Sequence, residues 1–183
     1  PSRGLGDVYK RQIVNRLVFI VVMIVMGLNQ GMQPIAGYNF GAKLYGRVNK
    51  VLRLTIIYAT VVTTFGFLVG MLVPDLVVGI FTSDAELTEL SVTGLRITVM
   101  FFPIIGFQMV TSNFFQSIGM AGKAIFLSLT RQMLILLPCL LVLPQFFGVA
   151  GVWYSMPVSD LLASLIALVM LVCQFRKFRT SPL

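Results

Sequence analysis

The chain has 183 residues, of which 57% are hydrophobic and only 11% are charged. A soluble domain of this length has too little interior to bury so much apolar surface, so the composition argues for a membrane protein. The absence of histidine excludes histidine-based acid–base and metal chemistry. The net charge of +8 comes from short clusters between apolar runs, a pattern that does not indicate nucleic-acid binding.

The first twelve residues, PSRGLGDVYKRQ, differ from everything that follows them. They are polar and aperiodic, and the stretch GDVYKRQ resembles translated sequencing-adaptor read-through. We therefore expect residues 1–12 to be non-native, residues 13–176 to form the folded unit and residues 177–183 to form a tail. Because the chain also lacks an initiating Met, we expect it to be a fragment.

Five apolar stretches are long enough to cross a bilayer, which takes about 20 mostly apolar residues. They are residues 13–40, 51–81, 84–118, 124–147 and 149–175. Ser83 and Glu86 form a capping box that predicts the start of the third helix. Since no stretch alternates apolar and polar residues at period two, we expect an all-α membrane protein, a bundle of five transmembrane helices.

The basic residues of the short loops predict the orientation of the bundle. The loops after the first and third helices and the tail all fall on one side. They hold Lys43, Arg47, Lys50, Arg53, Lys123, Arg176, Lys177 and Arg179. The opposite side holds acidic residues, among them Asp75 and Asp84. We therefore expect a cytoplasmic C terminus.

The second half of the first helix, GLNQGMQPIAGYNFGAK, is unusually polar for a membrane segment. Asn29 and Gln33 are four residues apart and share a face, while Gln30 and Pro34 form a neighbouring stripe. So many amides in one turn favour the wall of a polar cavity over hydrogen bonding between packed helices. The glycines at spacing four, for which we expect close helix packing, are Gly27, Gly31, Gly37 and Gly41.

The third helix repeats this polar pattern. Gln108, Ser112 and Gln116 follow one another at intervals of four residues, and Asn113 lies beside them. Both patches fall in the cytoplasmic halves of their helices. Their matching depth predicts one shared polar path along which a solute moves. In the second helix, Gly66 and Gly70 and the threonines indicate packing.

Two opposite charges stand inside the fourth and fifth helices, where an unpaired charge is costly. Arg131 lies about 10 Å from the inner end of its helix and Asp160 about 21 Å from the inner end of its own, at 1.5 Å per residue. Arg131 either snorkels to the interface or serves a role in the interior. The difference in depth favours a local hydrogen-bonded or cavity-facing site for Asp160 over an ion pair with Arg131, and a structural over an ion-coupling role.

Four prolines inside the predicted helices are expected to kink them, because proline removes a backbone donor. They are Pro34, Pro103, Pro138 and Pro157. The sequence shows no Ser/His/Asp set, metal-ligand cluster or phosphate-binding loop, and Cys139 and Cys173 lie singly in apolar runs. We expect neither an enzyme nor a cofactor.

The stretch GLNQGMQPIAGYNFGAK resembles the signature that ends the second helix of each half in the multidrug and toxic compound extrusion (MATE) transporters. Other stretches fit the same family in order over residues 13–176. They are IVNRL, FTSD, FFPIIGFQMVTSNFFQSIGMAGKA, LTRQMLILLP and GVAGVWYSMPVSD. The resemblance implies the incomplete C-terminal lobe of a twelve-helix fold, namely its helices eight to twelve, with the N-terminal lobe missing.

The resemblance further implies export of cationic and amphipathic compounds from the bacterial inner membrane, in exchange for Na⁺ or H⁺, by alternating access of two lobes. Some sodium-coupled members carry an acidic residue within the tenth helix. Residues 84–118 have none beyond their outer end, which puts a cation site of that type in question. Two alternatives are a flippase for lipid-linked oligosaccharides with the same fold and a non-transporting membrane scaffold.

Overall fold

A computed structural model describes residues 2–74, 76, 92, 95–97, 99–147 and 149–180 of the chain. Within these ranges every regular element is a helix, which confirms the all-α prediction. The elements are α1 (Ser2–Gly41), α2 (Tyr45–Leu72), α5 (Phe102–Ser117), α6 (Ala121–Leu129), the π-helix η1 (Thr130–Leu136), α7 (Leu137–Phe147) and α8 (Val149–Thr180).

Four helical segments among the described residues are long and apolar enough to cross a membrane. They are Val18–Gly41, Tyr45–Leu72, Ala121–Phe146 and Pro157–Phe178. These segments correspond to the first, second, fourth and fifth predicted spans. The 16-residue α5 is the end of the third predicted span, whose beginning, with Ser83 and Glu86, lies outside the described residues.

The first helix begins earlier than the sequence predicts. Residues 2–12 continue α1 without a break, although their composition suggested an aperiodic segment. Once a helix is nucleated, each added residue gains a hydrogen bond at a small cost, so an apolar helix readily propagates into a polar flank. The non-native origin of residues 1–12 stays a prediction.

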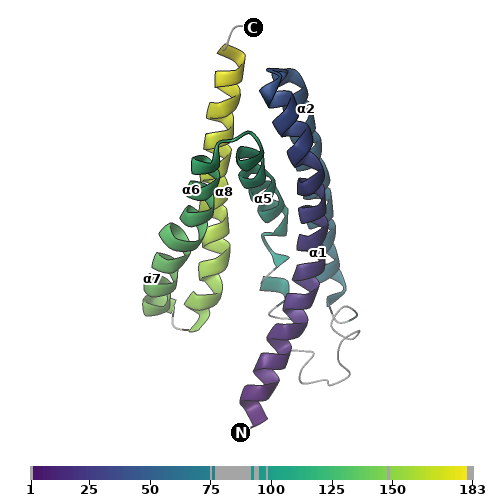
Figure 1. The fold of residues 1–183 in the computed structure, drawn as a ribbon. Helices are drawn as coiled ribbons and strands as arrows, with labels where there is room; N and C mark the ends of the chain where they lie inside the picture. Colours follow the sequence, from purple (N-terminus) through teal and green to yellow (C-terminus); the bar gives the residue numbers. More distant parts are fainter. Residues whose placement is uncertain are drawn as a thin grey trace.

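The helices form two groups that are joined through α5 (Figure 1). One group is the pair α1 and α2, and the other is α8 with the broken helix α6–η1–α7. α5 packs against members of both groups. The arrangement therefore places α5 at the centre of the bundle, where its polar residues other than Gln116 are buried or half-buried.

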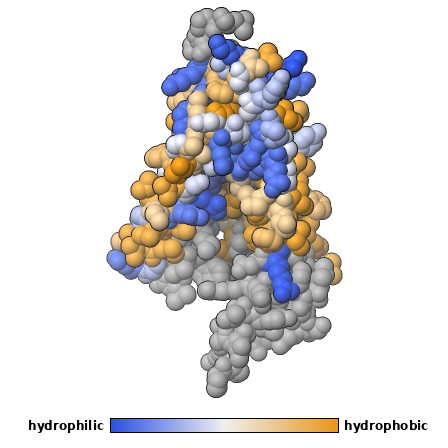
Figure 2. Space-filling model, viewed as in Figure 1, coloured by the Kyte–Doolittle hydropathy of each residue, from blue (hydrophilic) through white to orange (hydrophobic). Residues whose placement is uncertain are grey.

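The basic segments gather at one end of the bundle, as the sequence predicts. The turn between α1 and α2 contacts the end of α8, because the rings of Tyr45 and Phe178 stack with centroids 4.9 Å apart. Lys123, in the first turn of α6, donates a hydrogen bond from Nζ to Oε1 of Gln174 in α8. Figure 2 shows hydrophilic residues at this end, which carries the C terminus, and hydrophobic residues along the flanks below it.

Two helices end at this face with the same backbone motif. α1 ends through Lys43 at φ 59° and α5 through Gly119 at φ 77°. In each case the following amide, of Leu44 or Met120, bonds back to the carbonyl five residues earlier, at 2.9 Å. This six-to-one bond with a left-handed residue is the Schellman motif, which satisfies carbonyls that the helix end leaves free. Both turns thereby stay tight and keep their neighbouring helices close.

Large apolar side chains cover the outside of the bundle, as a lipid-facing surface requires. Phe19, Phe65 and Phe146 are more than half exposed, and many leucines and valines on α2, α7 and α8 are at least a third exposed. The interior is a cluster of small and medium apolar residues around Phe114 and Phe115 of α5. The helices therefore pack through their smaller inner faces and present their bulkier faces to lipid.

Close packing of the helices depends on fewer glycines than the spacing suggests. A Cβ added at Gly37 would lie 2.9 Å from the carbonyl oxygen of Ser117, so this glycine does permit contact between α1 and α5. At Gly27, Gly31 and Gly41 no described atom lies within 4 Å of such a Cβ, so within the described residues the packing role predicted for them is wrong. Spacing alone does not say which face of a helix meets a neighbour.

Among the described glycines, the one with the least room for a side chain is Gly106, where α5 meets α2. A Cβ here would lie 2.8 Å from Oγ1 of Thr63 and 3.2 Å from the carbonyl oxygen of Ala59. Thr63 cannot simply rotate away, because its hydroxyl donates to that same carbonyl at 2.9 Å. The contact therefore has no room for even a methyl group.

We expect Gly106→Ala to lower the thermal stability of the detergent-purified, full-length protein by the equivalent of about 1–3 kcal/mol, the usual cost of overpacking a core. Gly27→Ala is the matched control, because Gly27 is also a helical glycine but no described atom lies within 4 Å of a Cβ added there. Its stability should be unchanged or slightly higher, since alanine favours helix. Equal melting temperatures for the two variants would contradict the close approach.

Candidate functional site

The polar patches of α1 and α5 meet in the structure. Nε2 of Gln33 donates a hydrogen bond of 3.1 Å to Oδ1 of Asn113. One turn further on, Gly37 lies against Ser117. Both pairs are separated by 80 residues in the chain, so α1 and α5 run parallel in a constant register. Residues of the two patches can therefore be placed level by level.

One turn before this bond lies a buried layer of amides. In this register Asn29 of α1 lies at the same height along the bundle as residue 109 of α5. Gln108 is therefore only one residue away from the height of Asn29. Asn29 is 2% exposed and Gln108 5% exposed. Both amide atoms of Asn29 and Oε1 of Gln108 have no hydrogen-bond partner among the described residues. An unsatisfied buried polar group costs about 1–3 kcal/mol. The layer is therefore stabilised if the two amides rotate to hydrogen-bond each other, or if a polar molecule binds between them.

The remaining residues of the predicted cavity wall lie in other surroundings. Gln30 and Gln116 are exposed, which leaves their amides available outside the bundle. Ser112 is half-buried, and its hydroxyl lies 3.5 Å from Oγ of Ser128 and from the carbonyl oxygen of Ala124 in α6. The structure thus brings Gln33 and Asn113 together, encloses Asn29 and Gln108, and leaves Gln30 and Gln116 on the surface.

Arg131 and Asp160 form an ion pair, contrary to the preference derived from the sequence. Nε of Arg131 donates to Oδ1 of Asp160 at 2.8 Å. The depth comparison failed because it treated the two helices as straight and parallel. The fourth predicted helix is instead broken by η1 and inclined to α8 (Figure 1), and the long arginine side chain spans the remaining distance.

The pair depends on the π-helix η1, which carries Arg131. A π-helix closes its hydrogen bonds over five residues, so Arg131 and Leu136, five apart, lie on one side and line the same cavity. Pro138 follows the end of η1 and gives a physical reason for it, because a proline ring clashes with the carbonyl four residues earlier in an α-helix. The predicted distortion near Pro138 therefore takes the form of a π-helix.

The other prolines act differently. Pro103 lies in the first turn of α5, where no backbone donor is needed. The turn residues 100–101 separate α5 from the helical residues 95–97 and 99, so the predicted helix is interrupted beside Pro103. α1 and α8 both continue through their prolines, Pro34 and Pro157. Pro157 and the neighbouring Ser159 and Asp160 border the cavity described next.

A cavity of about 200 Å³ lies between the two groups of helices, beside the ion pair. Its charged residues are Arg131 and Asp160, whose side chains are 36% and 10% exposed. The rest of its wall is mainly apolar or aromatic. The lining residues are Val18, Ile97, Phe101, Phe102, Ile105, Arg131, Leu136, Pro157, Ser159 and Asp160. The sequence did not predict this cavity, because its residues come from four separate segments.

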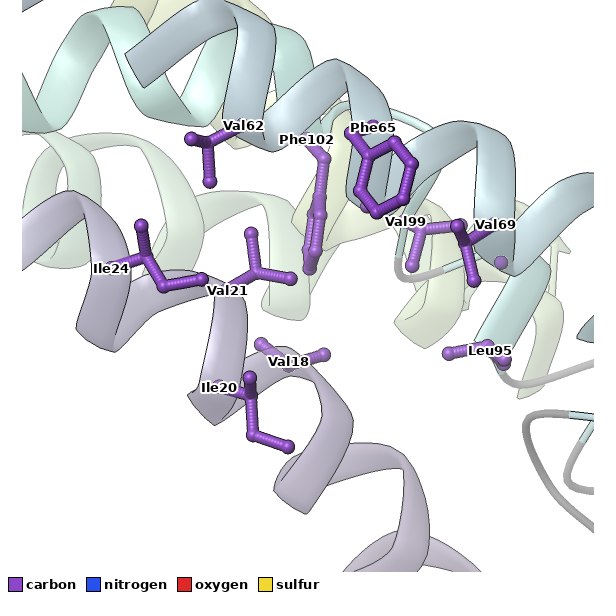
Figure 3. A pocket seen from close by; sticks show the side chains of 12 residues that line it. Val18, Ile20, Val21, Ile24, Val62, Phe65, Val69, Leu95, Val99 and Phe102 are labelled. Atoms are coloured by element: carbon purple, nitrogen blue, oxygen red, sulfur yellow. The ribbon is translucent and has the colours of Figure 1, made fainter. Parts of the chain in front are cut away.

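A second space of about 210 Å³ is entirely apolar in character. Figure 3 shows side chains of α1, α2 and residues 95–102 converging on it, with Val21, Val62 and Phe102 around its middle. Gly66 and Gly70 of α2 leave room at its wall, and an added Cβ would meet Val21 or Val99 at 3.0 Å. The packing role that the sequence predicts for these two glycines is thereby confirmed.

Comparison with known proteins gives matches over most of the chain. The family model MatE matches residues 11–141. The multidrug export protein MepA of Staphylococcus aureus is 28% identical over 153 residues, which are 84% of this chain but 34% of MepA. MepA of Staphylococcus saprophyticus is 24% identical over the same length. The chain thus spans about a third of these relatives.

Solved structures show the same helix arrangement. The MATE multidrug transporter DinF-BH, solved in complex with R6G, is 36% identical, with a TM-score of 0.82 over 93% of this chain and 38% of its own. An outward-facing MATE transporter of the MOP superfamily is 18% identical and has a TM-score of 0.85 over 97% of this chain and 40% of its own. The second likeness shows the fold alone.

Proposed function

The chain belongs to the MatE family, and on that premise we propose that it forms the C-terminal lobe of a multidrug efflux transporter rather than an enzyme. The observation that carries the proposal is the family match over residues 11–141, reinforced by the multidrug export protein MepA among its relatives. The four membrane-length helices are those of a multi-pass membrane protein. Transport by alternating access then requires a second lobe, which we propose is supplied by the rest of a longer protein.

We propose that the substrates are small cationic or amphipathic compounds and that they move along the polar residues of α1 and α5. The exposed amides of Gln30 and Gln116 and the bonded pair Gln33–Asn113 support this route. Asn29 and Gln108 form a buried layer that such a substrate reaches only if α1 and α5 separate locally.

We expect Gln33→Ala, Gln108→Ala and Ser112→Ala, made in the full-length protein, to change the relative resistance to different drugs by several-fold while protein levels stay near normal. The physical reason is that these side chains offer hydrogen bonds to substrates of some shapes and not of others. Resistance profiles in cells, normalised to protein level, measure the effect. Thr55→Ala is a control, because that hydroxyl bonds within its own helix, to the carbonyl of Val51. Unfolding without any change in profile would favour a packing role.

We propose coupling to Na⁺ or H⁺ in the intact transporter, with no cofactor. Asp160 is the single carboxylate among the described residues of the membrane-spanning segments. Its ion pair with Arg131 supports a structural role in the conformation described. Efflux driven by an imposed H⁺ or Na⁺ gradient across proteoliposomes tests the coupling ion. Efflux that needs neither gradient would remove this part of the proposal.

A lipid-linked oligosaccharide flippase with the same fold is the second candidate. Such a protein needs positive charge facing its cavity, and Arg131 is the residue that supports it. The partner Asp160 neutralises that charge, which favours the multidrug transporter. A non-transporting scaffold has no use for an enclosed ion pair or for buried unpaired amides, so these features argue against it.

We expect the basic end of the bundle to face the cytoplasm of a bacterial inner membrane. A cysteine placed at Lys50 should react with a membrane-impermeant maleimide only from the inside, and one at Asp84 only from the outside. The reason is that loops rich in Lys and Arg stay on the cytoplasmic side. Lys50 is exposed next to the turn between α1 and α2, so accessibility does not limit the reaction. Labelling of position 50 from outside would reverse the topology.

A further inference from the structure

The ion pair between Arg131 and Asp160 is unequal in its exposure. The carboxylate side chain is 10% exposed, whereas the arginine side chain is 36% exposed. The contact joins one carboxylate oxygen to Nε of Arg131, at 2.8 Å. Asp160 is thus a fixed, enclosed anion, and Arg131 is a long cation that reaches it from a more open position.

The cavity beside the carboxylate has the composition of a site for an organic cation. Its volume of about 200 Å³ far exceeds the roughly 10–15 Å³ that a single water molecule needs. Phe101 and Phe102 contribute to its wall together with Asp160. Apart from Arg131 and Ser159 the remaining wall is apolar. Aromatic rings and a carboxylate in such a space are the combination that binds ammonium groups, through cation–π and ionic attraction.

We propose that Asp160 and this cavity bind the ammonium group of an organic cation, and that Arg131 is a resident counter-ion which the ligand displaces. The inference deepens the proposed function and rests on it, since it locates a site for the cationic part of a substrate. Without ligand the pair is neutral. With ligand, Asp160 pairs with the ammonium group, and Arg131 carries its charge to a hydrated position.

Two features of the chain allow Arg131 to leave. Its side chain is long and partly exposed, so the guanidinium can move towards the polar end of the bundle while its stem stays against apolar surface. It also stands in η1, and π-helical segments are frequent at functional sites, where a change to α-helical bonding turns side chains around the axis. Asp160, short and in the regular helix α8, has neither freedom.

Binding to the purified full-length protein tests the site with two probes of the same shape. Benzyltrimethylammonium is charged, and neopentylbenzene is its neutral carbon counterpart. We expect the charged probe to bind at least ten times more tightly than the neutral one.

Asp160→Asn, which keeps the shape and can still accept a hydrogen bond from Arg131, should remove this preference. Arg131→Lys, a less well matched counter-ion, should increase the preference several-fold. Gln132→Asn, at an exposed position of η1 outside the cavity wall, should leave it unchanged.

A measurement on the unaltered protein avoids dependence on variants that fold poorly. With ¹⁵N-labelled arginine, the Nε signal of Arg131, assigned from its loss in Arg131→Lys, should shift on addition of the charged probe and not of the neutral one. Equal affinities for the two probes, or an unshifted Nε signal at saturation, would overturn the inference. Drug efflux that persists in such a protein would leave the proposed function standing, whereas selective binding without any efflux would overturn the function instead.

Discussion

Proteoliposomes that contain only residues 13–176 are expected to export no ethidium-type dye, whatever ion gradient is imposed. Alternating access requires two lobes that move against each other, and the chain spans about a third of the length of its relative MepA. The structure adds a reason at the level of residues. The amides of Gln30 and Gln116 are exposed among the described residues, so we expect a substrate held by them to remain open to the surroundings on its other side.

The control is the full-length transporter, reconstituted at the same protein-to-lipid ratio and assayed with the same dye. We expect gradient-driven efflux from it and only passive leakage from the shorter chain. Efflux by residues 13–176 above the leakage of empty liposomes would contradict the requirement for two lobes. It would then imply that copies of this lobe associate to form a complete pathway.

The polar contact between α1 and α5 could be predicted from the sequence to within one turn. Both patches lie a similar number of residues before a basic loop, and a regular α-helix converts that count directly into depth. In the structure the two patches meet through the hydrogen bond between Gln33 and Asn113. The burial of Asn29 and Gln108 could not be predicted, because a helical stripe of amides does not reveal which of its members a neighbouring helix covers.

Residue counts failed where the backbone is irregular or inclined. The π-helix η1 changes the angular position of each residue after Thr130, and nothing in hydropathy alone marks such a segment. Pro138 was the one available sign of it. The glycines show a related limit, since Gly37 and Gly27 have the same kind of spacing, yet only Gly37 meets another helix. Contacts of this kind depend on the angles between helices, which the sequence pattern does not contain.

The most destabilising single substitution at the ion pair is expected to be Arg131→Leu. It leaves Asp160, 10% exposed and too short to reach water, without its partner. Breaking a buried pair from one side typically costs about 3–5 kcal/mol, because the remaining charge loses its compensation. Asp160→Leu should cost less, since Arg131 is 36% exposed and its long stem lets the charge reach the interface.

The double variant Arg131→Leu/Asp160→Leu separates two contributions to stability: the net contribution of the ion pair, and the cost of leaving one buried charge unpaired. Replacing both members of a buried pair by apolar residues is often neutral or stabilising, so its thermal stability should lie near that of the unaltered protein. Melting temperatures of the four proteins in one detergent measure the cycle, and Gln132→Leu, an exposed neighbour on η1, controls for added hydrophobicity.

If the double variant were as unstable as Arg131→Leu, the loss would come from the shape of η1 and α8 rather than from charge. Stability without transport in the double variant would instead mean that the pair, costly to bury, is kept because the working transporter needs one or both of these charges at this depth.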